Sequence, residues 1–149
     1  METLETGNSA QQHVEGESRH LDAALRRLDL AREAEELRRG ESWLTNGHNA
    51  KTLAKYPNLR VVLLAFREGA RMGEHRAPGQ LTLHVLSGEV QLRLPEQIVN
   101  VSAGSLVTLE GSLLHDLEAR RDSVVLLTLS WPATASGAFG TSNASASRE

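Results

Sequence analysis

The chain has 149 residues, enough for one domain, and its formal net charge of -3 gives no basic field that would point to nucleic acid or to an acidic membrane surface. It has no cysteine, which excludes disulfides, thiolate metal sites and a cysteine nucleophile, and which fits a cytoplasmic location. Aromatic residues make up only 3% of the chain, so no stacking platform for bases or sugars is indicated.

Both ends of the chain lack the apolar periodicity of packed elements. Residues 1–18 are polar and mixed, and residues 133–149 are rich in serine and alanine, with Phe139 as one large apolar group. We expect a disordered N-terminal tail and a flexible C-terminal tail there. The N-terminus lacks the apolar stretch of a signal peptide, and no apolar run approaches the roughly 18 residues of a transmembrane helix, so no membrane partner is expected.

A helical segment is predicted over residues 19–40. Leucine and alanine recur at helical spacing on one face before Asp29 and on a second face after it. This change of phase predicts two short helices, with Asp29 capping the second and Gly40 ending it. We expect the segment to pack on its own domain; a helix that binds a partner is the alternative.

From about residue 51 the pattern changes to short strands separated by turn signals. Continuous apolar runs cover residues 60–66 and 123–130, and apolar residues alternate with others over residues 81–86 and 90–94. Short strands at intervals of about ten residues are typical of a sandwich or small barrel. Because residues 60–66 have two apolar faces, we expect the core to cover one face, and the N-terminal helices or a second subunit to cover the other.

Two histidines stand at fixed distances from glycines. His75 follows Gly69 after five intervening residues, and Gly88 closes the same stretch. His115 follows Gly104 at the end of a second stretch. Each stretch thus begins with a glycine and carries a histidine downstream of it, but the two spacings differ.

This spacing resembles the two motifs of the cupins, a large group of β-barrel proteins. The resemblance covers residues 51–131 and extends to small single-domain proteins with a conserved barrel (the cupin_2 type) that have no assigned activity. It implies an all-β fold, a double-stranded β-helix or cupin jelly-roll barrel over residues 41–132, preceded by short N-terminal helices. It implies no particular activity, because that fold hosts enzymes, sugar-binding modules and regulatory modules.

The set of metal ligands that the resemblance implies, three histidines and one carboxylate, is incomplete here. Ala77 stands at the second histidine position, on the same strand face as His75. Leu81 stands at the carboxylate position, with Gln80 immediately before it. His75 and His115 remain as candidate ligands for a divalent ion such as Zn, Fe, Mn or Ni, and Gln80 can add an oxygen if the preceding turn swings it inward.

The rest of the motifs also departs from the pattern. Glu110, Ser112 and Ala119 stand where the second motif has proline, glycine and asparagine. Glu74 and Arg76 flank the first histidine and are expected to point away from it. The motifs therefore indicate the fold better than they indicate a function.

Two other histidines have less defined positions. By alternation His84 faces outward, but a one-residue bulge would turn it inward as a further ligand. His48 lies in a turn-forming stretch and is expected in a loop. The pocket around His75 and His115 is expected to be mostly apolar, lined by Ala77, Leu81, Leu83 and Val85.

The function predicted from the sequence is binding or sensing of a small, partly apolar molecule, with a degenerate or absent metal site. The alternative is a metal-assisted enzyme that acts on a small molecule, as a dioxygenase, decarboxylase or isomerase does. A structural domain whose dimer surface is its function is a third interpretation. We expect a cytoplasmic homodimer without a nucleic-acid partner.

Overall fold

The structure, a computed structural model, describes residues 20–131, so the tails expected at 1–18 and 133–149 lie outside the described residues. Three short helical segments come first: η1 (His20–Asp22), α2 (Leu30–Arg39) and α3 (Glu41–Asn46). Nine strands follow within the described part: β1 (His48–Tyr56), β2 (Leu59–Phe66), β3 (Arg71–His75), β4 (Leu81–Ser87), β5 (Glu89–Leu94), β6 (Gln97–Ser102), β7 (Leu106–Leu109), β8 (His115–Ala119) and β9 (Ser123–Ser130).

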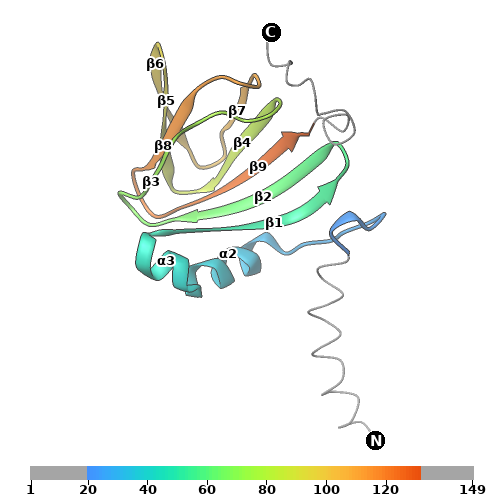
Figure 1. The fold of residues 1–149 in the computed structure, drawn as a ribbon. Coiled ribbons are helices and arrows are strands. Elements are labelled where there is room, and N and C mark those ends of the chain that lie inside the picture. Colours follow the sequence, from blue (N-terminus) through green and yellow to red (C-terminus); the bar gives the residue numbers. More distant parts are fainter. Residues whose placement is uncertain (1–19, 132–149) are drawn as a thin grey trace, which may run out of the picture.

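The strands form two antiparallel sheets that face each other. One sheet has five strands in the order β1-β2-β9-β4-β7, and the other has four in the order β3-β8-β5-β6. The chain passes repeatedly from one sheet to the other, as in a jelly roll, and the helices lie outside the five-stranded sheet (Figure 1). The predicted all-β jelly-roll fold with short N-terminal helices is thus confirmed.

The main core lies between the two sheets. Alternate residues of β4, β5 and β9 point inward, and Phe66, Val85, Leu92 and Val125 are almost completely buried there. A fully buried aliphatic or aromatic side chain contributes roughly 1.5–3 kcal/mol relative to an exposed one. The period-two pattern of the sequence is therefore the main determinant of which residues face the space between the sheets.

The predicted cap at Asp29 and the helix that begins after it are confirmed by the structure. Helix α2 begins after Asp29, whose Oδ1 accepts a hydrogen bond from the backbone N–H of Arg32 at 3.2 Å. It ends at Gly40, whose N–H donates to the carbonyl of Leu37 at 3.1 Å. The first expected helix is much shorter than predicted, since between residue 20 and α2 only the single turn η1 forms.

Helix α2 covers the outer face of the five-stranded sheet. Ala34 and Leu37 pack against Leu53, Leu63 and Ala65 in a second, smaller apolar cluster. This packing explains why the run over residues 60–66 is apolar on both faces, because one face meets the core and the other meets the helix. The expectation that the helical segment packs on its own domain is confirmed.

The expectation for His48 is wrong. His48 is the first residue of β1 and pairs with Phe66 of β2, with ring centroids 6.1 Å apart. The turn signal before it belongs to Gly47, which has a φ of 83° and ends α3. The strand begins earlier than local propensity indicated because β2 provides a complete pairing edge, and pairing overrides propensity.

We expect Leu37→Ala to lower the free energy of unfolding by about 2–3 kcal/mol, because the substitution leaves a cavity between α2 and the sheet. The matched control is Leu44→Ala on α3, where the side chain is 59% exposed, and it should change stability by less than about 0.5 kcal/mol. Urea unfolding followed by circular dichroism measures both. Equal, small effects would show that α2 does not contribute to the stability of the domain.

Candidate functional site

Two neighbouring strands of the four-stranded sheet bring the motif histidines together. His75 ends β3 and His115 begins β8, and the two residues are direct partners in the antiparallel pairing. Their rings lie 4.4 Å apart between centroids, at an interplanar angle of 61°. The spacing of the two motifs in the sequence thus translates into a single pair of edge-to-face imidazoles.

Backbone hydrogen bonds fix the tautomer of both rings. Nδ1 of His75 lies 2.8 Å from the carbonyl oxygen of Gly73, and Nδ1 of His115 lies 2.8 Å from that of Leu113. A carbonyl oxygen only accepts, so each Nδ1 carries the hydrogen and donates it. In the neutral ring Nε2 then holds a lone pair, which can accept a hydrogen bond or bind a metal ion.

The environment of His115 favours its neutral form. The residue is only 6% exposed. Burial lowers the pKa of His115 below its usual value, and the nearby His75 lowers it further, against the opposing effects of the Leu113 carbonyl and the Asp116 carboxylate. His115 therefore offers a neutral lone pair near pH 7.

A cavity of about 230 Å³ adjoins the two rings. Its lining is apolar apart from the histidines and Arg76, and it consists of Leu64, Met72, His75, Arg76, Ala77, Pro78, Leu81, Leu83, His115, Leu117, Leu127 and Leu129. Three of the four predicted pocket residues are among them. Val85 is not: it is completely buried deeper in the core, because the cavity occupies only one end of the space between the sheets.

Two loops meet at the mouth of this cavity. The N–H of Ser112 donates to the carbonyl of Ala77 at 3.0 Å, and Nε of Arg76 donates to the carbonyl of Ser112 at 3.2 Å. Ser112 has a φ of 63°, a left-handed conformation that favours glycine, which is the residue that the second cupin motif has at this position. Arg76, expected to point away from the site, instead lines the mouth, because this contact draws its side chain across the loop.

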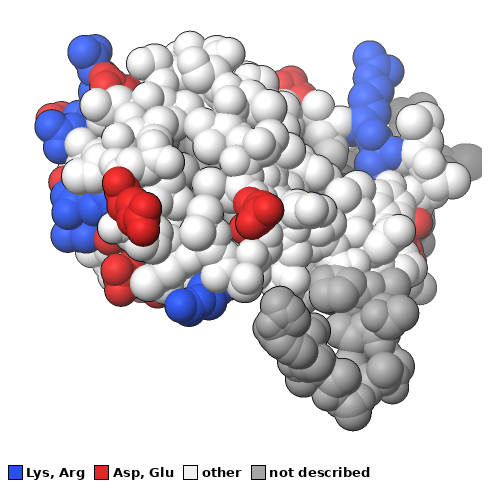
Figure 2. Space-filling model, turned by 90° about the horizontal axis from the view of Figure 1, so that it is seen from above, with Lys and Arg blue, Asp and Glu red and all other residues white. Residues whose placement is uncertain are grey.

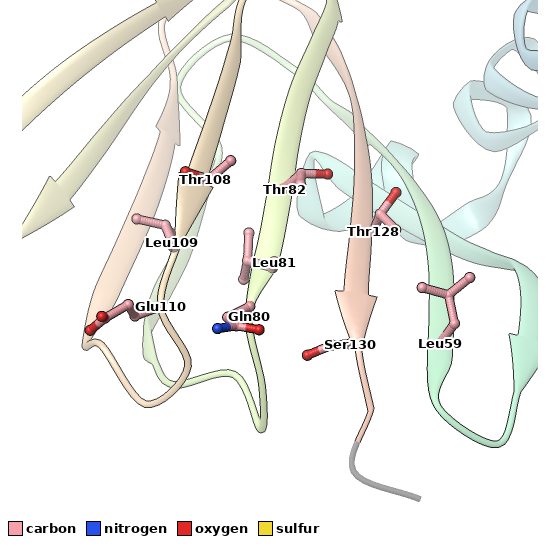
Figure 3. Close-up of a pocket in the computed structure, with 9 residues that line it drawn as sticks. All are labelled: Leu59, Gln80, Leu81, Thr82, Thr108, Leu109, Glu110, Thr128 and Ser130. Atoms are coloured by element: carbon pink, nitrogen blue, oxygen red, sulfur yellow. The ribbon is translucent and has the colours of Figure 1, made fainter.

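Gln80 does not join the histidines. It is exposed and lines a separate, more open groove of about 500 Å³ with Thr82, Thr108 and Thr128 (Figure 3). The turn before it is held outward because Gly79 packs against the backbone of Ser130, where an added Cβ would lie 2.6 Å from the carbonyl oxygen. The proposed inward swing of Gln80 is therefore wrong. The groove is larger than the cavity, but none of its lining residues is a histidine.

His84 faces away from the cavity, as alternation predicts. It pairs with Leu106 and Leu126 on the outer face of the five-stranded sheet, and no bulge reverses its direction. Within residues 20–131, no group of three or more His, Cys, Asp or Glu residues comes close enough together to hold a metal ion. His75 and His115 are thus left as a pair, without a third ligand of these types.

Sequence reasoning missed Met72, which lines the cavity beside the two histidines. Simple alternation puts residues 71, 73 and 75 on one strand face and residue 72 on the other. The register of β3 against β8 shifts between Met72 and His75, and this irregularity turns both side chains inward. The glycine at position 73 is the one local signal of such a bulge.

Solved structures with the same architecture were found by comparison of the folds. A conserved protein of unknown function from Streptococcus pyogenes aligns with a TM-score of 0.60 and 22% identity, over 72% of this chain and 88% of that one. A cupin-2 domain protein from Shewanella frigidimarina aligns with a TM-score of 0.57 and 12% identity, over 69% and 93%. A cupin superfamily protein from Desulfitobacterium hafniense gives 0.56 and 16%, over 58% and 80%.

These likenesses show that the chain has the cupin fold, as the motifs implied. No model of a known protein family matches the chain, and no curated protein matches it. Among the described residues no helix is long and apolar enough to cross a membrane. The function must therefore be argued from the site itself.

We expect stability to fall as the pH is lowered through the ordinary histidine pKa of about 6.5, because the folded state disfavours protonated His115 and the unfolded chain then binds more protons. The contribution of one proton is at most about 1.4 kcal/mol per pH unit. Urea unfolding at pH values from 7 to 5 measures it. His115→Gln should remove this component, and His84→Gln on the outer face should retain it; an unchanged slope in His115→Gln would contradict the assignment.

Proposed function

We propose that the chain binds or senses a small, partly apolar molecule in the cavity between the sheets, with the two imidazoles as its polar anchors. The observation that supports this most is the pair of Nε2 lone pairs, left by the backbone bonds of His75 and His115, in a lining that is otherwise almost wholly apolar. Ligand sites commonly combine such an apolar wall with a few fixed polar groups.

The chemistry of the cavity restricts the ligand. A hydroxyl or an amide N–H can donate to Nε2 of either ring, whereas an acceptor without a hydrogen would leave the lone pairs unsatisfied at a cost of about 1–3 kcal/mol. The volume of about 230 Å³ is below the common range of roughly 300–1,000 Å³ for ligand pockets. A compact apolar molecule with one donor group fits these limits best.

The alternative, a metal-assisted enzyme using Zn, Fe, Mn or Ni, has less support. The methyl group of Ala77 and the isobutyl group of Leu81 stand where further ligands would be needed, and both residues line the cavity. Catalytic zinc sites use three protein ligands, and non-haem iron commonly uses two histidines and a carboxylate. The cavity offers two histidines and no carboxylate, which is too few ligands for a catalytic zinc site or for the usual non-haem iron site.

A ligand screen tests the proposal. We expect small alcohols and amides with an apolar body to shift the imidazole ¹H–¹³C resonances of His75 and His115. Ala77→Leu fills part of the cavity and should weaken binding by at least tenfold, while His84→Gln, outside the cavity, should bind as the wild type does. Circular dichroism checks that each variant is folded. Equal binding by Ala77→Leu, or no ligand in a broad screen, would refute the proposal.

A homodimer in the cytoplasm remains part of the proposal. Because α2 covers the outer face of β2, a second copy would use the outer face of β4 and β7, where Leu106 is 57% exposed. Figure 2 shows one face of the molecule, seen from above the view of Figure 1, on which charged side chains are few. We expect a dimeric mass in sedimentation at micromolar concentration and a monomeric one for Leu106→Glu; a monomeric wild type would exclude the dimer.

A further inference from the structure

One basic side chain stands at the mouth of the cavity. Apart from the two histidines, Arg76 is the one cavity-lining residue with a charged or hydrogen-bonding side chain, and no aspartate or glutamate is among the lining residues. A guanidinium keeps its positive charge at every pH at which proteins are folded. The binding of an apolar molecule through the histidines alone leaves this charge without a role.

Two other arginines of the same region are matched by carboxylates. Arg71 binds Asp116 at 2.8 Å, and Arg93 binds Glu118 at 3.1 Å, both on the outer face of the four-stranded sheet. In the part of the chain that the structure describes, no acidic side chain forms an ion pair with Arg76. The described residues therefore leave the charge at the mouth uncompensated, and an external anion can take the partner's place.

A contact between two loops orients the guanidinium. Nε of Arg76 donates to the carbonyl of Ser112 at 3.2 Å, and the N–H of Ser112 donates to the carbonyl of Ala77 at 3.0 Å. The terminal nitrogens of Arg76, Nη1 and Nη2, donate to no acceptor among the described residues. These two nitrogens form the planar fork that binds a carboxylate through two parallel hydrogen bonds.

The depth of the polar groups separates two parts of a ligand. Arg76 is exposed, whereas His115 is buried, and both line the same cavity. An anion beside Arg76 stays partly in water, so its desolvation costs less than that of a buried charge. A group that donates to the histidines must instead pass the apolar walls, which favours a neutral hydroxyl there.

The number of charges restricts the anion. Arg76 supplies one positive charge, and the cavity walls are otherwise mostly leucine, with methionine, alanine and proline. A carboxylate carries one negative charge, whereas a phosphate monoester carries about 1.5–2 near pH 7. The second charge of a phosphate would have no partner beside these walls. A monocarboxylate therefore matches the mouth better than a phosphate does.

We propose that Arg76 determines the ligand class: a compact apolar molecule that carries one carboxylate and one hydroxyl. The carboxylate binds Nη1 and Nη2 of Arg76 at the mouth, and the hydroxyl donates to Nε2 of His75 or His115 farther in. The apolar body lies against leucine side chains such as Leu81. This inference rests on the proposed binding function and specifies the chemistry of its ligand.

Pairs of probes that differ in one group isolate the role of the carboxylate. Para-hydroxybenzoate and para-hydroxybenzamide share a ring and a hydroxyl, and ω-hydroxyhexanoate and ω-hydroxyhexanamide are an aliphatic pair of the same design. In titration calorimetry of the full chain near pH 7, the carboxylate of at least one pair should bind about tenfold more tightly than its amide. Added salt should reduce this preference, because it screens exposed charges.

The variant Arg76→Gln removes the charge and the fork but keeps a polar side chain. It should lose the preference for the carboxylate and bind the amides as the wild type does. Arg120→Gln makes the same change in net charge at an exposed residue that follows β8, at the end of that strand remote from His115, and should retain the preference. Arg76→Lys keeps the charge without the fork and should bind the carboxylate with intermediate affinity.

Three results would overturn the inference. The first is the absence of a carboxylate preference in both pairs, including the absence of any binding by the four probes. The second is an equal loss of carboxylate and amide binding in Arg76→Gln, which would assign Arg76 to the loop contact alone. The third is equal affinity for para-hydroxybenzyl phosphate and the carboxylates. Circular dichroism shows whether each variant is folded.

The same data separate this inference from the proposed function. Binding of the amides without a preference for the carboxylates would refute the ligand class and leave binding in the cavity intact. If none of the four probes binds, the ligand class fails, and the broad screen with Ala77→Leu then decides separately whether the cavity binds small molecules.

Discussion

The antiparallel pairing of β3 with β8 is the constraint on which the site depends. It sets His75 directly opposite His115, and the irregularity in the same pair turns Met72 to the cavity side. The pairing is supported from the outer face as well. Arg71 of β3 forms an ion pair with the buried carboxylate of Asp116 on β8 at 2.8 Å. Strand β8 thus carries an ion pair on one face and the inner imidazole on the other.

The ion pairs extend across the outer face of the four-stranded sheet. One of their members, Asp116, is the neighbour of His115 in the sequence and affects the pKa of that histidine. Arg93 of β5 binds Glu118 at 3.1 Å and lies 3.9 Å from Asp116, so β3, β8 and β5 share one charged outer surface. Side-chain alternation keeps these charges out of the cavity. The carboxylate of Asp116 still raises the pKa of His115, but burial outweighs it, and the ring stays neutral. A charged outer face and a neutral inner face therefore coexist on a single strand.

Much of the fold follows from the period of the apolar residues, and the limits of prediction lie where that period breaks. The alternation of apolar residues predicted β4 and β5 and the outward direction of His84. The change of helical phase at Asp29 predicted where α2 begins. The glycine-to-histidine spacings identified His75 and His115. Met72 was missed because the register shift in β3 is not visible in composition. Gln80 was misplaced because the packing of Gly79 against Ser130, far along the chain, decides the direction of the turn.

Ala77 and Leu81, at positions where the cupin motifs have metal ligands, give the cavity an apolar wall beside the two histidines. Leu81 in place of a carboxylate removes a negative charge and adds apolar volume, so the charge that the cavity can stabilise falls while its affinity for apolar groups rises. Ala77 in place of a second histidine leaves room beside His75. What remains is a largely apolar space with two fixed lone pairs and with Arg76 at its mouth. A hydrogen-bond donor carried on an apolar ligand would satisfy these lone pairs, and the proposed binding function rests on that complementarity.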